Sequence, residues 1–213
     1  MRNALLRGNL KKNDALFMYG ALCAKPYIHV YEQESVEVVH GPSCKPEDEI
    51  YLNRCSKDGV PVVERRGGGG TVVLSPGMLV TVIVGNRNTD QSPLEVFTYL
   101  HKAYISVLEQ NGIENVSSRG ISDLALDNKK ILGSSLYMGR NPDYYYYQSC
   151  LMVESDISLL PLYLKHPPRE PDYRIKRSHE EFCTTLKARG YNENLRNLKK
   201  AIREGLKKHL GEC

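Results

Sequence analysis

The feature that most restricts the fold of this chain is a run of four glycines at residues 67–70. The residues before it (60–63) and after it (71–74) are apolar and rich in β-branched side chains, which predicts a strand on each side. Ordering four glycines costs much conformational entropy, and a flexible linker is the alternative explanation of such a run. Because strands anchor both ends, we expect an ordered loop.

The chemistry predicted for this loop is anion binding. Glycines let a ligand approach the backbone, and successive N–H groups can surround an anion. Arg65 and Arg66 precede the run and suit phosphate or carboxylate. A strand follows the run and no Gly-Lys-Ser/Thr is present, so neither a P-loop nor a dinucleotide-binding fingerprint is indicated.

Apolar periodicity predicts interleaved strands and helices along the rest of the chain. A helix begins after Ser92, where Pro93 and Glu95 complete a capping box, and it ends near Gly112. Further strands are expected at 28–31, 36–40, 78–84, 123–126, 130–136 and 144–153, and further helices at 47–57, 156–164 and from Leu195 to the C-terminus. This pattern predicts an α/β (α+β) fold with a mixed, largely antiparallel sheet flanked by helices. We expect residues 1–213 to form a single domain.

Composition excludes several classes of protein. Hydrophobic residues make up 41% and charged residues 25%, as in globular domains. No segment approaches the roughly 20 apolar residues of a membrane span, and residues 1–12 lack a secretory signal, so a cytoplasmic protein without membrane contact is expected. The net charge is +4, and no nucleic-acid-binding motif is present. Basic residues at 187–213 indicate either a surface for an acidic partner or a solvated helix face.

Lys130 and Asp123 are the other candidate functional residues. Lys130 lies in a predicted strand beside Gly133 and Ser134, where a lysine can face a ligand or protect a sheet edge. Asp123 can help to hold a divalent metal beside a phosphate, although taken alone it is more typical of a turn or surface. The six cysteines, including Cys150 and Cys183, form no C-x-x-C pair and indicate reduced thiols rather than a zinc site.

Two sequence blocks resemble the lipoate–protein ligase A family, within the superfamily of biotin/lipoate–protein ligase and octanoyltransferase catalytic domains. The first block is ERRGGGGTVVLSPG at residues 64–77 and the second is SDLALDNKKILGSS at residues 122–135. The segment SCLMVESDISLLPLYL at residues 149–164 is similar to the family's late strand and Asp-Leu helix. The resemblance covers most of residues 10–165.

This resemblance implies an enzyme that activates lipoate or octanoate with ATP and Mg²⁺ to an acyl-adenylate. The acyl group then passes to a lysine of a lipoyl-domain or glycine-cleavage H-type acceptor protein. Carried over from the family, Lys130 is catalytic and contacts both the acid and the adenylate. Asp123 is a candidate magnesium ligand from its own chemistry. The ATP contacts are Arg65, Gly70, Thr71, Val72 and Val73, together with Lys130. The residues that shape the loop are Arg66, Gly68 and Gly69, and the lipoate contacts are Lys130, Gly133 and Ser134. Val72, Val80, Val82 and Leu136 are candidates for the acyl slot or for the core.

The chain departs from the family pattern at several positions. Leu74 stands where many ligases have His, residues 147–149 replace a frequent His-His-Gly, and Gly41-Pro42 replaces an early Gly-Arg pair. The small C-terminal accessory domain is not expected in residues 1–213, which suggests a separate accessory chain or a type that works without one. The main alternative is acyl transfer from an acyl carrier protein through a cysteine. No cysteine lies in residues 111–122 or near Pro167, where relatives place it, but Cys150 and Cys183 leave this alternative open. Biotin transfer and a non-catalytic lipoyl-binding relative are further alternatives.

Overall fold

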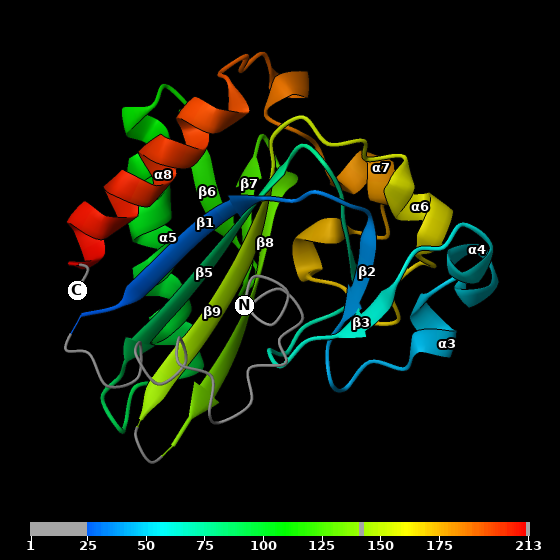
Figure 1. The fold of residues 1–213 in the computed structure, drawn as a ribbon, viewed down its shortest axis with the longest axis horizontal. Helices are drawn as coiled ribbons and strands as arrows, with labels where there is room; N and C mark the ends of the chain where they lie inside the picture. Colours follow the sequence, from blue (N-terminus) through cyan, green and yellow to red (C-terminus); the bar gives the residue numbers. More distant parts are fainter. Residues whose placement is uncertain (1–24, 141–142, 212–213) are drawn as a thin grey trace.

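The computed structural model describes residues 25–140 and 143–211, in which two β-sheets pack with helices (Figure 1). The larger sheet has the strand order β1-β5-β9-β8-β7-β6, and every neighbouring pair is antiparallel. Its strands are β1 (Tyr27–Glu32), β5 (Met78–Asn86), β6 (Val116–Arg119), β7 (Asp123–Leu126), β8 (Lys129–Gly139) and β9 (Tyr144–Met152). The smaller sheet, β2 (Glu37–His40), β3 (Val62–Glu64) and β4 (Val72–Leu74), joins a parallel β2/β3 pair to an antiparallel β2/β4 pair. The expected mixed, largely antiparallel architecture is confirmed.

Two long helices cover one face of the larger sheet. They are α5 (Pro93–Gln110) and α8 (Leu195–Leu210), which pack against each other, with α8 beside β1 and in front of α5 in Figure 1. The predicted capping box of α5 is present, because the N–H of Glu95 donates to Ser92 Oγ at 3.3 Å and the N–H of Ser92 donates to Glu95 Oε2 at 2.7 Å. The main hydrophobic core lies between these helices and the sheet.

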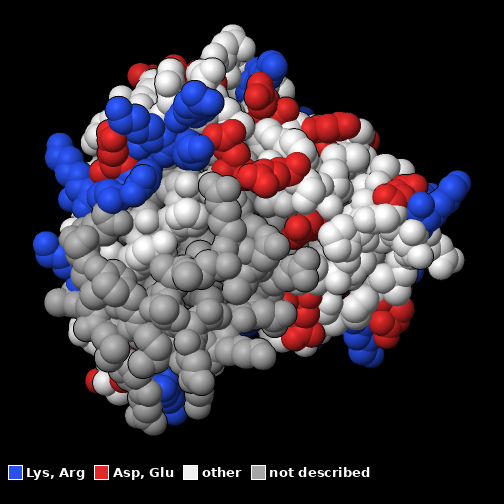
Figure 2. Space-filling model, viewed as in Figure 1, with Lys and Arg blue, Asp and Glu red and all other residues white. Residues whose placement is uncertain are grey.

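Helix α8 is amphipathic, as its sequence predicts. Leu198, Ile202, Leu206 and Leu210 are buried against the main core. The outer face is basic, and Figure 2 shows Lys and Arg side chains gathered over this part of the molecule. Within the described residues, no helix is long and apolar enough to cross a membrane.

A second core lies beside the smaller sheet and the short helices. These are α3 (Pro46–Glu49), α4 (Leu52–Lys57), α6 (Leu159–Tyr163) and α7 (His179–Phe182), with 3-10 turns η1 (Asp172–Arg174) and η2 (Lys187–Arg189). The prediction of one continuous helix over residues 47–57 is wrong. Ile50 is buried in this core and forms an isolated antiparallel bridge with Leu164, so its extended backbone separates α3 from α4.

The hairpin that precedes β8 is confirmed. Asp127 and Asn128 have φ values of 46° and 63°, which two-residue hairpin turns of the primed types require. Strand β6 and the short helices after residue 165 were not predicted, and α6 is shorter than the helix expected at 156–164. Cys23 and Cys213, whose reduced state was predicted, lie outside the described residues.

Candidate functional site

A cavity of about 750 Å³ lies between the two sheets. Its walls come from β5, β8 and β9 of the larger sheet, from β4 and the glycine loop, and from the segment that connects α6 to α7. A volume of this size falls in the range of ligand-binding sites. The glycine loop and Lys130, 60 residues apart in the sequence, therefore face the same space.

The glycine loop, residues 65–71, connects the two outer strands of the smaller sheet. Because β3 and β4 both pair with β2, the loop passes over the end of β2. A Cβ atom on Gly41, which directly follows β2, would collide with the carbonyl oxygen of Gly69. Gly69 itself has φ +103°, a conformation that favours glycine. The predicted ordered loop is confirmed, and the crossing explains the glycine at position 41.

Arg65 holds this loop in place. Its side chain is buried, and its guanidinium donates to the carbonyl oxygens of Val39 at 3.2 Å, Gly68 at 3.0 Å and Gly70 at 2.7 Å. Burial lowers the pKa of Arg65 from its ordinary value, which still leaves an arginine charged. Arg66 points elsewhere, with its guanidinium carbon 5.1 Å from the centre of the Tyr137 ring.

Glu49 fixes the far end of the loop. Its Oε2 accepts hydrogen bonds from the Thr71 hydroxyl at 2.6 Å and from the Thr71 N–H at 3.1 Å. Glu49 is buried at the end of α3 and lines the cavity. The break between α3 and α4 thus places a carboxylate against a loop that was expected to bind anions, and it occupies both donors of Thr71.

Lys130 is one end of a chain of polar contacts that runs through Asp123 to Tyr173. Its Nζ is 2.7 Å from Asp123 Oδ1, and Tyr173 donates its hydroxyl proton to Asp123 Oδ2 at 2.8 Å. Burial acts to lower the pKa of Lys130, but the charge and hydrogen bond of Asp123 contribute to a net rise above the ordinary value. The ammonium is therefore held charged inside the cavity.

Gly133 provides the space in which the Lys130 side chain lies. A Cβ atom at position 133 would stand 2.8 Å from both Cε and Nζ of Lys130. The end of the lysine therefore extends over the backbone of β8 toward β7, where Asp123 pairs with Gly133 in the sheet register. The Gly that the family pattern places three residues after the lysine has a direct geometric reason here.

One row of residues across the larger sheet runs from this polar pair to an apolar region. The register aligns Asp123, Gly133, Cys150, Val80 and Tyr31 on neighbouring strands, and all five line the cavity. Opposite residues in antiparallel strands project from the same face. The cavity thus has a charged end at Lys130 and an apolar floor toward β1.

Of the four candidates for the acyl slot, Val72 and Val80 line the cavity, whereas Val82 and Leu136 are absent from its lining. Leu136 packs against the main core on the helical side of the sheet. The departures from the family pattern do fall in the site, because Leu74 and Gln148 both line the cavity.

Ser134 belongs to a buried polar network behind Lys130. Its hydroxyl lies 2.7 Å from the Ser122 carbonyl oxygen, to which it donates, and 3.2 Å from His101 Nε2. Since the hydroxyl proton is used, Nε2 of His101 carries the donor proton, and Nδ1 accepts from Ser118 Oγ at 2.9 Å. Burial lowers the pKa of His101 to about 4, so the imidazole is neutral at pH 7.

Cys150 and Cys183 are free thiols that line the cavity. Burial raises the pKa of Cys150 to about 12. Burial also raises the pKa of Cys183, although the nearby Lys130 and Arg174 charges oppose this rise. Both sulfur atoms are therefore held as neutral thiols, which are poor nucleophiles.

Asp123 does not fit the role of a magnesium ligand in this arrangement, because Lys130 and Tyr173 already occupy its two oxygens. Magnesium in phosphate-binding sites is bound through one or two carboxylates together with the phosphates. Among the described residues, no group of three or more His, Cys, Asp or Glu side chains is arranged to hold a metal ion. We therefore assign magnesium to no residue of this chain.

The structure brings most of the predicted site residues together around one cavity. The lining includes Arg65, Gly69, Gly70, Thr71, Val72, Val73, Asp123, Lys130, Gly133 and Ser134, but neither Arg66 nor Gly68. Three further lining residues, Glu49, Tyr173 and Arg174, were not predicted. The dense charged stretch REPDYRIKR at residues 169–177 was the available signal for two of them.

The antiparallel sheet, the glycine loop held by Arg65 and Glu49, and the half-buried Lys130 are the features that the comparison with known families has to account for. The family model of the lipoyl protein ligase A/B catalytic domain matches residues 9–207, so the chain belongs to this family. The chain is 29% identical over 161 residues to the mitochondrial lipoyl amidotransferase of Homo sapiens, covering 75% of this chain and 41% of that protein. It is 24% identical over 184 residues to lipoate-protein ligase A subunit 1 of Thermoplasma acidophilum, covering 82% of this chain and 69% of the subunit. The chain thus spans less than half of the human relative.

Solved structures agree on the fold. The bipartite lipoate protein ligase of Thermoplasma acidophilum, described with its E2 lipoyl domain, has a TM-score of 0.81 at 21% identity, covering 100% of this chain and 80% of that one. A putative lipoate protein ligase of the same organism with bound lipoic acid has a TM-score of 0.78 at 17% identity, covering 100% and 81%. A lipoate-protein ligase A bound with ATP has a TM-score of 0.79 at 20% identity, covering 98% and 80%. These likenesses establish the expected lipoate-ligase type of fold.

Proposed function

We propose that this protein is an ATP-dependent lipoate–protein ligase. In this reaction the carboxylate of lipoate or octanoate attacks the α-phosphorus of ATP, and pyrophosphate leaves. The lysine amine of an acceptor protein then attacks the carbonyl carbon of the acyl-adenylate, and AMP leaves. The observation that carries the proposal is the charged Lys130 in a cavity shared with the glycine loop.

The chemistry of the first step suits this arrangement. A carboxylate and a phosphate repel each other as they approach, and a fixed ammonium between them lowers that electrostatic barrier. Asp123 holds Lys130 in its charged form. Because Gly133 has no side chain, the Lys130 Nζ atom can lie on the side of the sheet that faces the cavity. The apolar floor formed by Cys150, Val80 and Tyr31 suits a hydrocarbon chain whose carboxylate lies at Lys130.

The glycine loop has a modified role in this proposal. The sequence resemblance assigned Arg65 to ATP, but in the structure this guanidinium is bound to three backbone carbonyl oxygens. We therefore assign Arg65 and Glu49 to the support of the loop. In this proposal the groups that contact the nucleotide are the backbone of Gly69 and Gly70 and the side chain of Lys130, all of which line the cavity.

Relatives support the identity of the substrates. One structure of the same fold contains ATP and another contains lipoic acid. The bipartite ligase of Thermoplasma acidophilum is described with an E2 lipoyl domain, which supports a lipoyl-domain acceptor and a separate accessory chain. The proposal also includes an H-type acceptor protein and a cytoplasmic site of action.

The test is ATP–pyrophosphate exchange with lipoate, octanoate and biotin. Exchange with lipoate or octanoate is expected for the wild type, and Lys130→Ala is expected to abolish it while the protein stays folded. Lys129→Ala is the matched control, since it removes the neighbouring lysine, which does not line the cavity. Absence of exchange with every acid, together with acyl transfer from an acyl carrier protein, would refute the ligase.

A second candidate function is acyl transfer through a cysteine. It is favoured by the position of Cys183, which lines the cavity close to Lys130, and by the similarity to an amidotransferase. The raised pKa of Cys183 counts against it, because transfer requires a thiolate. Cys183→Ser separates the two functions, since a ligase retains exchange in this variant and a cysteine transferase loses transfer.

A further inference from the structure

Two isoleucines are the most exposed large apolar side chains among the described residues. Ile175 is 75% exposed and Ile121 is 64% exposed. Single apolar side chains on a surface are common and indicate nothing by themselves. The position of these two in the fold distinguishes them from the other exposed apolar residues.

Both isoleucines lie beside one contact between two segments that line the cavity. Ile121 belongs to the turn between β6 and β7, which lines the cavity. The preceding residue, Gly120, packs against the start of η1, since a Cβ atom there would stand 3.3 Å from Pro171 Cβ. Ile175 directly follows η1, whose residues also line the cavity. The two side chains therefore border the same edge of the cavity.

This edge is the charged end of the cavity. Tyr173, two residues before Ile175, donates its hydroxyl proton to Asp123 at 2.8 Å. The same carboxylate lies 2.7 Å from the ammonium of Lys130. In the proposed function the acyl carbonyl lies at Lys130, so the lysine that accepts the acyl group has to reach this end. A protein that carries this lysine on its surface must then cover the adjoining rim.

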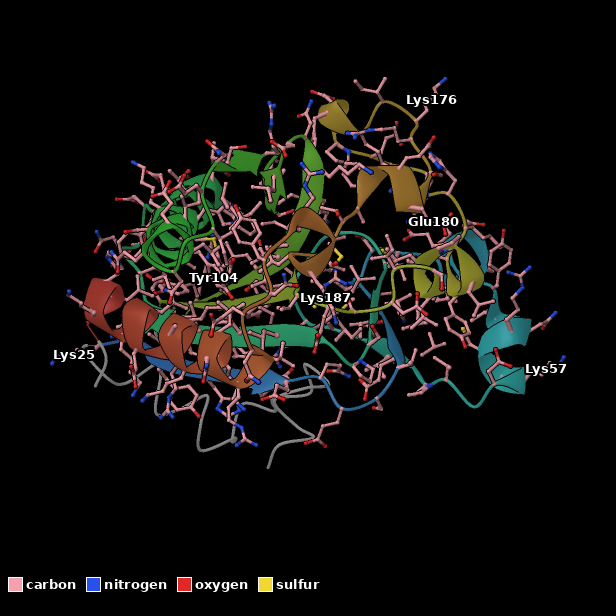
Figure 3. All side chains as sticks on the ribbon, turned by 90° about the horizontal axis from the view of Figure 1, so that it is seen from above. Lys25, Lys57, Tyr104, Lys176, Glu180 and Lys187 are labelled. Carbon is pink, nitrogen blue, oxygen red and sulfur yellow. The ribbon has the colours of Figure 1, made fainter. Side chains whose placement is uncertain are left out.

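The backbone at Ile175 holds the side chain outward in a strained conformation. Its φ and ψ angles are 51° and 50°, the left-handed region that β-branched residues rarely adopt. Figure 3 shows the next side chain, Lys176, directed away from the molecule. An isoleucine that is exposed and strained contributes little to the fold, and strain of this kind clusters at binding segments.

The rim around the two isoleucines is positively charged. Its exposed cations are Arg119, Arg169 and Lys176, of which the two arginines also line the cavity. Within residues 119–122 and 169–177, all of which the structure describes, Asp172 is the one exposed carboxylate. A positive rim repels the ammonium form of an incoming lysine, so a partner needs carboxylates beside that lysine.

We propose that Ile121, Ile175 and the surrounding cations form the surface on which the acceptor protein docks. The occupant is a folded domain that presents its target lysine from an exposed turn, with an apolar side chain and carboxylates next to it. The inference rests on the proposed function, which requires a protein acceptor at this end of the cavity. A few apolar anchors within a polar rim are typical of protein interfaces.

The experiment compares two nucleophiles for the acyl-adenylate that the full chain forms from ATP and lipoate. One is an E2 lipoyl domain, and the other is hydroxylamine, which attacks the acyl carbonyl, releases AMP and needs no docking surface. Ile175→Asn is expected to lower the rate of transfer to the lipoyl domain, relative to hydroxylamine, by roughly fivefold or more, the effect of losing one interface anchor. Ile175→Leu keeps an apolar side chain and should keep most of the transfer.

Thermal unfolding separates docking from a structural role of Ile175. Asn adopts the left-handed conformation more readily than a β-branched residue, and the Ile175 side chain gives up little buried surface. Ile175→Asn should therefore raise the melting temperature by about 2–4 °C while it lowers transfer to the lipoyl domain. A fall in melting temperature together with equal losses for both nucleophiles would show a structural role and overturn the inference.

Leu94→Asn is the matched control. Leu94 is 58% exposed on α5, which covers the opposite face of the larger sheet, and it is not part of the cavity lining. The substitution removes an apolar side chain of similar size and should leave the ratio of the two rates unchanged. Equal changes of this ratio in Leu94→Asn and Ile175→Asn would show a general surface effect and overturn the assignment.

The remaining outcomes also decide the question. A ratio in Ile175→Asn equal to that of the wild type overturns the inference. A wild-type dimer that Ile175→Asn dissociates without any change in the ratio does so too, because the surface then binds a second copy of the chain. Reaction with hydroxylamine but no transfer to the lipoyl domain overturns the docking surface and leaves the ligase standing. Absence of both products and of ATP–pyrophosphate exchange overturns the ligase itself and the inference with it.

Discussion

Gly133→Ala tests whether Lys130 acts from the position in which the sheet holds it. The added Cβ would stand 2.8 Å from Cε and Nζ of Lys130, whereas ordinary van der Waals contact begins near 3.4 Å. The end of the lysine must therefore move by at least about 0.6 Å. The move draws Nζ away from Asp123, to which it now binds at 2.7 Å.

The expected effects on stability and on activity differ in size. The displaced atoms are the flexible end of a long side chain, and the Lys130 side chain is 21% exposed, so we expect unfolding to become easier by only about 1 kcal/mol. A catalytic group displaced by about 1 Å typically loses on the order of a hundredfold in rate. Gly133→Ala should therefore reduce ATP–pyrophosphate exchange by roughly 10- to 100-fold in a protein that remains folded.

The assay combines thermal unfolding with exchange measurements in a double-mutant cycle. If Gly133 acts through the lysine, the destabilisation that Gly133→Ala causes in the wild type should be absent in a Lys130→Met background, where the added methyl group meets no ammonium. Wild-type exchange in Gly133→Ala would refute the reasoning. A destabilisation that is equally large in both backgrounds would show that the added methyl group collides with a group other than Lys130.

Three further predictions follow from the polar contacts of the site. In the folded protein the pKa of His101 is about 4, against an ordinary value of 6.5. The free energy of unfolding should therefore fall by about 3 kcal/mol as the pH is lowered from 6.5 to 4, because the unfolded chain then binds a proton at this imidazole that the folded protein does not. Urea unfolding across this pH range measures the effect, and His101→Gln should remove it. Glu49→Ala leaves both donors of Thr71 without their acceptor and should lower the free energy of unfolding in urea by about 2 kcal/mol. The control Glu47→Ala, at an exposed position, should change it by almost nothing. Equal effects of the two substitutions would contradict the role of Glu49 in holding the loop. Cys150→Ser should retain exchange activity, because burial holds this thiol neutral; a complete loss would favour the transferase.

Local sequence patterns determined most of the secondary structure. The capping box at Ser92 and Glu95, the two left-handed residues at the β7–β8 turn and the apolar stripe of α8 each depend on contacts within a few residues, so their outcome is visible in the sequence. The glycine run between two β-branched segments likewise specified an ordered loop. The family resemblance placed Lys130 in the same predicted site as that loop, although 60 residues separate them.

Only the tertiary structure decided what the charged groups do. Arg65 was expected to contact a nucleotide, but the crossing of the glycine loop over β2 presents three carbonyl oxygens to its guanidinium. The break at Ile50 depends on a bridge to Leu164, more than a hundred residues away, and it places Glu49 against Thr71. Periodicity and turn chemistry are local properties, whereas the burial of a charge and the identity of its partners exist only once the chain is folded.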